Sequence, residues 1–278
     1  MTRATAAKTP ADVDIVTPVY GSPEFLRELL RTMLEHEAGV RWSWTLVDDC
    51  GPDREKVDSV FAEIKDPRVH VIKNNKNSGF AMSNNFGFSR GSSPLLLMLN
   101  SDIVIMQDNW LREMTNEFTE GADSVYTGVV GAKLLFFEEA MVNYAKSEIR
   151  PPGRVQHAGV GFNVLGQAYH IFQGWKPDNP RVNVRREMNA VTGACLMTRR
   201  DVYQKIGGLD RQYTTGNFED VQYALQVRAL GGKVIYTPKT TLYHFAGGSG
   251  NSATAKYNAS LFQMKCKDLI EYDDWRYL

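Results

Sequence analysis

The sequence predicts one α/β domain with a mostly parallel central sheet and helices on its faces. Short apolar runs alternate with helical patterns through residues 1–121, an order typical of parallel sheets with right-handed crossovers. One run, Leu95–Leu99, holds five continuous apolar residues between turn signals, which indicates a strand buried on both faces. Polar residues directly follow several predicted strands, and ligands bind beyond the carboxyl ends of strands in open α/β sheets.

The first half of the chain provides four predicted strands and four predicted helices. The strands cover residues 13–19, 44–47, 69–72 and 95–99. A helix is expected to begin at Ser22 and Pro23, because serine is a good N-cap and proline a good first helical residue. Gly39 ends it. Further helices are expected around residues 57–64, 80–89 and 108–118, with Asp108 as the cap of the last.

The second half is less regular. Strands are predicted within residues 125–137, 190–198 and 233–237, and another ends at residues 243–245. Residues 155–175 are rich in glycine and aromatics, which favours a hairpin or a loop over a cleft. Short helices are expected after Asp201 and after residues 216–220. No Pro/Ser-rich linker separates the halves, so residues 13–278 are interpreted as one unit behind a loose tail at residues 1–12.

Composition restricts the class of protein. The 278 residues are 43% hydrophobic and 23% charged, with 32 Lys+Arg against 32 Asp+Glu. A net charge of zero argues against broad electrostatic binding to nucleic acid or anionic membrane, although Arg181, Arg185 and Arg186 could form a local basic patch. The three cysteines fit no zinc or disulfide spacing, and no apolar stretch approaches a membrane span. A cytoplasmic protein is expected, with peripheral placement at the inner membrane face left open.

Asp102 is the most informative residue of the first half. It follows the Leu95–Leu99 strand after only Asn100 and Ser101. A short acidic element at that place is suited to hold a divalent metal and, through the metal, a diphosphate. The alternative is that Asp102 caps a turn.

Several segments resemble the motifs of family 2 glycosyltransferases with the GT-A fold. They are 14–20 (DIVTPVY), 46–49 (LVDD), 77–81 (NSGFA) with Asn85, 99–102 (LNSD), 193–195 (GAC), 218–220 (FED) and His244. Their order and spacing together are specific, and the resemblance runs from about Asp14 to Gly248. It extends to bacterial rhamnosyltransferase-like members. The resemblance implies a single Rossmann-like GT-A domain with a smaller acceptor-side lobe. Its nucleotide-binding half is expected at 13–121 and its acceptor-binding and catalytic half at 122–278.

The resemblance also implies a donor site at the sheet edge. An aspartate after the second strand, Asp48 or Asp49, would accept a hydrogen bond from N3–H of uracil or thymine, with Tyr20 beside the base. The alternatives are a capped turn at Asp49, a plain polar turn at 77–79 and close strand packing at Gly193. The donor residues implied are Pro18, Val19, Tyr20, Asp48, Asp49, Asn77, Gly79, Asn85, Asn100, Ser101, Asp102, Gly193 and Ala194.

The implied metal site departs from the family pattern. Asn100 stands where the family usually carries the first acid of Asp-x-Asp, and asparagine brings no charge to a metal. Asp102 then becomes the main carboxylate ligand of Mn²⁺ or Mg²⁺, and His244 is the implied second protein ligand. The alternative for His244 is a structural histidine between Tyr243 and Phe245.

The catalytic pair implied is Glu219 and Asp220. Inverting transfer needs a base that takes the proton of the acceptor hydroxyl, and Asp220 matches the family's base, with Glu219 as an acid that orients the acceptor. The alternative is that acids in a first helical turn are simply favoured by the helix dipole. His157 and Trp175 resemble acceptor-side positions, although such side chains are commonly part of a core.

These expectations combine into one predicted function. The chain is expected to transfer a sugar from a UDP- or dTDP-sugar to a hydroxyl of a surface glycan or lipid-linked saccharide. The alternatives are glycosylation of a hydroxylated base in DNA, and a non-catalytic relative that binds nucleotide sugars. The loop Gly21–Pro23 lacks the glycine pattern of a dehydrogenase and the basic, glycine-rich loop of a nucleotidyltransferase.

Overall fold

The structure, a computed structural model, describes residues 12–118, 126–137, 153–245 and 252–273. The expected tail at residues 1–12 therefore lies outside it, except for Asp12. The strands are β1 (Val13–Val19), β2 (Trp42–Asp48), β3 (Val69–Lys73), β4 (Leu95–Leu99), β5 (Ile103–Ile105), β6 (Thr127–Leu135), β7 (Val155–His157), β8 (Val160–Phe162), β9 (Ala168–His170), β10 (Arg186–Glu187), β11 (Cys195–Arg199) and β12 (Lys233–His244). The helices are α1 (Pro23–Glu35), α2 (Arg54–Glu63), α3 (Gly79–Phe88), α4 (Trp110–Thr115), the 3-10 turn η1 (Asn116–Phe118), α5 (Arg200–Ile206), α6 (Glu219–Ala229) and α7 (Ser252–Cys266).

One large sheet runs through the molecule in the order β10-β12-β6-β11-β4-β1-β2-β3. The pairs β1–β2, β2–β3 and β1–β4 are parallel, which confirms the predicted parallel half. β11 lies between β4 and β6 and is antiparallel to both, so the second half of the sheet is mixed. β5 pairs with β12, and β7 pairs with β6, at the margin of this sheet.

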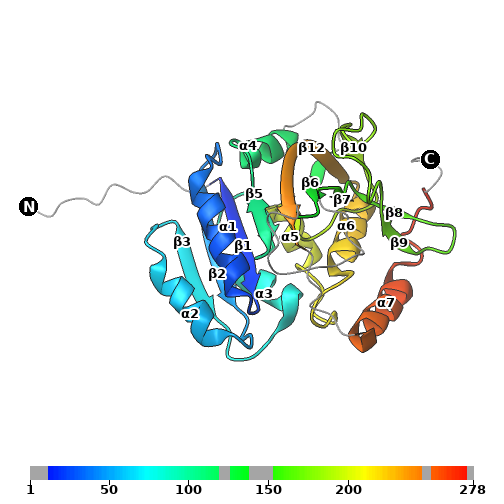
Figure 1. The fold of residues 1–278 in the computed structure, drawn as a ribbon. Helices are drawn as coiled ribbons and strands as arrows, with labels where there is room; N and C mark the ends of the chain where they lie inside the picture. Colours follow the sequence, from blue (N-terminus) through cyan, green and yellow to red (C-terminus); the bar gives the residue numbers. More distant parts are fainter. Residues whose placement is uncertain (1–11, 119–125, 138–152, 246–251, 274–278) are drawn as a thin grey trace, which may run out of the picture.

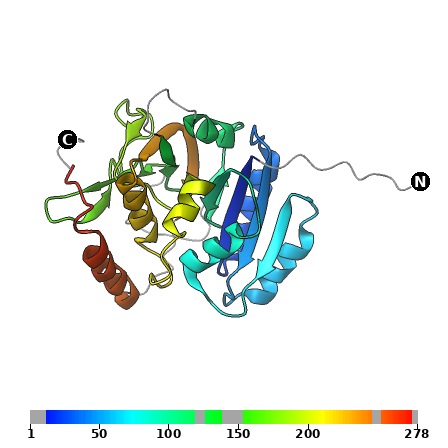
Figure 2. The same cartoon turned by 180° about the vertical axis from the view of Figure 1, so that it is seen from behind.

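Helices cover both faces of the sheet, as predicted. Alternate residues of β4 point to opposite faces, so Leu97 and Leu99 pack with α1, α2 and α4, while Leu96 and Met98 pack with α3, α5, α6 and α7. Figure 1 shows the face with α1 and α2, and Figure 2 shows the opposite face with α3, α5 and α6. The result is a three-layer α/β domain of the class that the sequence predicts.

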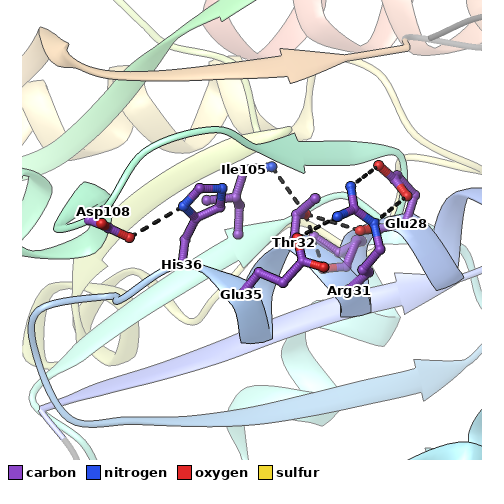
Figure 3. A network of polar contacts seen from close by, with 8 residues as sticks. Glu28, Arg31, Thr32, Glu35, His36, Ile105 and Asp108 are labelled. Carbon is purple, nitrogen blue, oxygen red and sulfur yellow. Dashed lines mark hydrogen bonds and ion pairs between the residues drawn. The ribbon is translucent and has the colours of Figure 1, made fainter.

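Helix α1 fixes the segment that follows the 100–102 turn. The Thr32 hydroxyl is buried, donates to the Glu28 carbonyl at 3.0 Å and accepts from the Ile105 amide at 3.2 Å (Figure 3). Asp108 accepts from the Glu37 amide at 2.9 Å and contacts His36. β5 is thereby held beside α1, and Asp102 directly precedes β5.

The structure corrects several boundaries. Ser22 and Pro23 occupy the expected N-cap and first helical positions of α1, but Ser22 has a left-handed backbone (φ 52°) and makes no side-chain cap bond. The helix ends at Glu35 rather than at Gly39. Asp108 does not cap α4, because Asn109 occupies the N-cap position. The two strands expected near residues 233 and 245 are one strand, β12, with a register shift between Thr237 and Thr241. The strand expected at 190–198 begins only at Cys195.

Candidate active site

Loops that follow neighbouring parallel strands are joined at one edge of the sheet. The Asp49 amide donates to the Val19 carbonyl at 2.8 Å, and the Asn74 amide donates to the Asp48 carbonyl at 2.8 Å. The loops after β1, β2 and β3 therefore form one connected surface at the carboxyl ends of these strands.

The end of β1 presents one exposed aromatic side chain. Val19 is fully buried and Pro18 half-buried, whereas Tyr20 is 49% exposed. Gly51 packs against the backbone here, since a Cβ on it would lie 2.4 Å from the Gly21 nitrogen. Of the three residues predicted at the end of β1, Tyr20 is the one whose ring is open to a ligand.

The two aspartates after β2 have different surroundings. Asp49 Oδ1 accepts from the Ser78 amide at 2.8 Å and from the Asn74 side-chain amide at 2.7 Å, and Oδ2 accepts from the Gly79 amide at 2.9 Å. Asp48 is equally buried, and its Oδ1 accepts from the Cys50 amide at 3.1 Å. Within the described part of the chain, Asp48 Oδ2 has no hydrogen-bond partner; it faces Arg54 Nε at 3.5 Å.

The loop predicted beside the nucleotide connects the two halves. Asn77 is exposed, and its Oδ1 accepts from the Gly79 amide at 3.0 Å. Gly79 has φ +80°, and a Cβ on it would lie 3.2 Å from the Thr215 nitrogen, so this loop touches the segment before α6. Asn85 lies apart from this contact, since its amide pairs with the Leu209 amide and carbonyl and with the Tyr203 hydroxyl.

The 100–102 turn meets the end of β12. Asp102 Oδ1 lies 3.2 Å from His244 Nε2, and Asn100 Nδ2 lies 3.2 Å from the same nitrogen. The Phe245 amide donates to the Asp102 carbonyl at 3.1 Å, which anchors the turn to β12. Ser101 is half-buried within the turn. Asn100 and His244, 144 positions apart in the chain, are thus brought into contact.

Gln156 of β7 is a neighbour of His244 that sequence reasoning missed. It is 5% exposed, its Oε1 lies 2.6 Å from His244 Nδ1, and its Nε2 donates to the His244 carbonyl at 2.8 Å. Glutamine in a short strand carries no local signal of such a role, because its partner lies 88 residues away.

Asp102 and His244 fit one divalent cation. Two adjacent ligands of an octahedral ion, each about 2.1 Å from it, lie about 3 Å apart, close to the 3.2 Å between Oδ1 and Nε2. Among the described residues no group of three or more His, Cys, Asp and Glu side chains gathers as a closed metal site. The pair would therefore hold an ion whose other ligands are substrate oxygens and water.

Glu219 and Asp220 open α6, as predicted; Glu219 is buried and Asp220 is half-buried. Asp220 Oδ2 accepts from the Gly193 amide at 2.6 Å, and Oδ1 accepts from the Val221 amide at 2.8 Å. Glu219 is 3% exposed, and its Oε2 has no hydrogen-bond partner among the residues that the structure describes.

Burial raises the pKa of both carboxyl groups. For Glu219 the negative charge of Asp220 raises the pKa further. For Asp220 the hydrogen bonds from Gly193, Val221 and the Thr192 hydroxyl oppose the rise. Because these bonds stabilise the charged form of Asp220, they favour the negative charge of the pair on Asp220 over Glu219.

Gly193 has little room beside Asp220. A Cβ on Gly193 would lie 3.1 Å from Asp220 Cβ and 3.2 Å from Phe80 Cε1, so the glycine permits the close approach of the carboxylate. Ala194 is buried, and its carbonyl accepts from the Asn100 amide at 3.0 Å. The dipeptide 193–194 therefore bridges the α6 carboxylate and the 100–102 turn.

Of the two predicted acceptor-side residues, His157 contacts the segment that leads into this bridge. The buried His157 accepts from the Thr192 amide at Nε2, 3.3 Å away, and its Nδ1 lies 2.8 Å from Nδ1 of His170. Burial lowers the pKa of His157 well below its usual value, so the ring is neutral. Trp175 is 36% exposed, with its ring 4.7 Å from that of Phe172. His157 supports the 192–193 segment, and Trp175 presents a partly open ring.

None of the helices in the described ranges is long and apolar enough to cross a membrane. The division of the domain at residue 121 stays a prediction.

Comparison with known proteins identifies relatives in polysaccharide synthesis. The O-antigen biosynthesis protein RfbC of Myxococcus xanthus is 29% identical over 244 residues, which cover 85% of this chain and 17% of RfbC. The succinoglycan biosynthesis protein ExoO of Rhizobium meliloti is 28% identical over 171 residues, 60% of this chain and 47% of ExoO. The chain thus spans less than half the length of either relative.

Two solved structures share the fold. A mannosyltransferase of Pyrobaculum calidifontis, PcManGT, in complex with GDP-Man and Mn²⁺, aligns with a TM-score of 0.60 at 12% identity, over 93% of this chain and 63% of its own. GalNAc-T7 with UDP, GalNAc and Mn²⁺ aligns with a TM-score of 0.64 at 14% identity, over 92% of this chain and 48% of its own. Both likenesses confirm the GT-A fold. Residues 14–207 match the model of the family described as glycosyl transferase family 2, and the chain belongs to that family.

Proposed function

We propose that this chain is an inverting glycosyltransferase that moves a sugar from a UDP- or dTDP-sugar to an acceptor hydroxyl. One observation carries the proposal. An unbroken series of contacts runs from Asp220 through Gly193 and Ala194 to Asn100, and from Asn100 to His244, which also faces Asp102. This connection supports the proposal that a base and a pair of metal ligands act together in one site, as displacement of a diphosphate requires.

Asp220 acts as the base. Its carboxylate takes the proton of the acceptor hydroxyl, and the freed oxygen forms a bond to the anomeric carbon from the side opposite the leaving group. The bond from that carbon to the diphosphate oxygen breaks, and its electron pair leaves with the nucleoside diphosphate. The backbone amides of Gly193 and Val221 orient the carboxylate for this step, because they occupy one lone pair on each oxygen.

Glu219 complements this base. With its proton retained, it does not compete for the acceptor proton, and its buried carboxyl can hydrogen-bond the acceptor hydroxyl. In this pair the ionised acid, Asp220, is the base, and the neutral acid, Glu219, orients the acceptor.

Asp102 and His244 would hold the divalent cation, which supplies charge neutralisation for the departing diphosphate. Both solved neighbours contain Mn²⁺, which supports this choice of ion. With Asn100 in place of an acid, the protein contributes one negative charge rather than two. We therefore propose that Asp102 and His244 bind the cation by themselves and that the donor diphosphate strengthens this binding.

Asp48 is the proposed reader of the nucleotide base. Both oxygens of Asp49 are engaged by the 74–79 loop, whereas Asp48 Oδ2 lacks a hydrogen bond from the described residues. A carboxylate oxygen accepts from N3–H of uracil or thymine but meets a lone pair in cytosine. Asp49 then serves to hold the loop, and Tyr20 is the ring placed to contact the base.

The proposed acceptor is a hydroxyl of a surface glycan or lipid-linked saccharide. The names of the relatives, for O-antigen and succinoglycan biosynthesis, support this class. The partly open ring of Trp175 is suited to stack on a sugar. A net charge of zero gives no support to a DNA acceptor.

A donor panel tests the proposal. UDP-, dTDP-, GDP- and CDP-sugars are incubated with the protein and Mn²⁺, and release of nucleoside diphosphate is followed with and without saccharide acceptors. Release from UDP- or dTDP-sugars, with an anomeric proton of inverted configuration in the NMR spectrum of the first product, is the expected result. Retention of configuration, or no release from any donor, would overturn the proposal.

A further inference from the structure

We infer that Gln156 is a positioning residue that holds His244 in the tautomer able to bind a divalent cation through Nε2. The inference rests on the metal site proposed above and goes beyond it, because Gln156 itself would not touch the metal. Two contacts of one buried amide carry the argument.

The first contact fixes the orientation of the amide. Gln156 Nε2 lies 2.8 Å from the backbone carbonyl of His244. A carbonyl oxygen only accepts hydrogen bonds, so the atom facing it must be the NH₂ group. The other end of the amide, Oε1, is therefore the atom that faces the imidazole.

The second contact fixes the proton on the ring. Gln156 Oε1 lies 2.6 Å from His244 Nδ1 and can only accept. Nδ1 must then carry the hydrogen, and in the neutral ring Nε2 keeps its lone pair. The Asn100 side-chain NH₂, 3.2 Å from Nε2, can donate to that lone pair. Asp102 Oδ1, also 3.2 Å from Nε2, is an acceptor, and the two atoms would share a bound cation.

The position of Gln156 in the sheet restricts the movement of His244. β7 and β12 both pair with β6, where Leu134 is opposite His157 on one side and Leu242 on the other. The amide spans the carbonyl and the ring of the same histidine, so it fixes both the backbone and the side chain of His244. Hydrogen bonds from outer residues to a metal-binding histidine typically change metal affinity by about 10- to 100-fold.

The tautomer of His244 can be measured in the metal-free protein, without an activity assay. Long-range ¹H–¹⁵N correlation spectra of the metal-free protein distinguish a proton on Nδ1 from one on Nε2, and His244→Asn assigns the signal. We expect Nδ1–H in the wild type, Nδ1–H in Gln156→Glu, whose carboxylate still accepts, and loss of that preference in Gln156→Met. A proton on Nε2 of His244 in the wild type would overturn the inference even if no variant folds.

Mn²⁺ affinity gives the second readout, followed through the EPR signal of the free ion with Mn²⁺ as the sole ligand. Gln156→Met is expected to weaken Mn²⁺ binding by about 10- to 100-fold, and Gln156→Glu to stay within a few-fold of the wild type. The control is Gln263→Met, which removes a glutamine that also donates to a backbone carbonyl, that of Gly166 at 2.9 Å, away from the site.

The outcomes separate the tautomer role from a structural one. Equal losses in Gln156→Glu and Gln156→Met would show that the bond to the His244 carbonyl alone matters, and would overturn the inference. Unchanged Mn²⁺ affinity in Gln156→Met, or no Mn²⁺ binding by the wild type, would do the same. Failure of every sugar donor would refute the proposed function and leave these two readouts intact.

Discussion

Replacing Gly193 by alanine tests whether the proposed base depends on one backbone amide. The added Cβ would lie 3.1 Å from Asp220 Cβ, 3.2 Å from Phe80 Cε1 and 3.3 Å from Asp220 Oδ2. These contacts are tighter than ordinary van der Waals contact, so the carboxylate must move by a few tenths of an ångström. The 2.6 Å bond from the Gly193 amide then lengthens or breaks.

The expected size of the effect on Asp220 follows from the strength of that hydrogen bond. A hydrogen bond to a charged group contributes about 1.5–3 kcal/mol. Its loss destabilises the ionised form of Asp220, so the pKa of Asp220 should rise further above its usual range. Misplacement of the base adds to this, and we expect turnover near neutral pH to fall about 10- to 100-fold.

The assay is the pH dependence of kcat/KM for the donor identified by the panel. Asp220 acts in its ionised form, so a higher pKa moves the acidic limb of the profile to higher pH in Gly193→Ala. Gly161→Ala is the matched control, because a Cβ there would meet Tyr169 at 3.1 Å and Asp273 at 3.2 Å, with equal crowding and no contact to Asp220. An unmoved acidic limb, or equal losses in both variants, would refute the reasoning.

Three further predictions concern the other parts of the site. Asp102→Ala and His244→Ala are each expected to weaken UDP binding about tenfold or more in the presence of Mn²⁺ and to leave metal-free binding unchanged in calorimetry; full wild-type activity in excess chelator would contradict a required metal. Asp48→Asn should remove a preference for UDP over CDP of about ten- to hundredfold, since a mispaired buried polar group costs about 1–3 kcal/mol; equal wild-type affinities would show that Asp48 does not read the base. Glu219→Gln should raise the free energy of unfolding above that of the wild type at alkaline pH. The reason is that the folded-state pKa of Glu219 is raised, so its stabilising contribution in the wild type is lost as pH rises through that pKa. If urea unfolding gives the same difference between variant and wild type at about pH 6 and at about pH 9, Glu219 is not a buried, protonated acid.

The parallel half of the fold was predictable because its signals are local. β1 and β4 have the predicted bounds. In β4, five continuous apolar residues between turn signals mark a strand buried on both faces. α7 was not predicted, because its buried residues, among them Asn258 and Phe262, contact segments far away in the chain. β5 was missed because three residues after a turn carry no periodicity.

Some residues of the candidate site could likewise be predicted from the sequence, and others could not. Asp102, Asp220 and His244 were found because the order of short motifs marks them, and the structure brings all three into one series of contacts. The choice between Asp48 and Asp49 depends on which oxygens accept backbone hydrogen bonds, which no pattern in the sequence reveals. Gln156 likewise depends on a pairing across β6 that strand periodicity cannot supply.

The central claim is that Asp220 is the base of a glycosyl transfer, and Asp220→Asn tests it most directly. The amide keeps the shape of the side chain but cannot take a proton, so kcat should fall at least about 100-fold. Calorimetry should give an affinity for UDP in the presence of Mn²⁺ within about twofold of the wild type, because Asp220 contacts the acceptor rather than the nucleotide. Turnover within about tenfold of the wild type, or a loss of UDP affinity that accounts for the whole defect, would contradict the account.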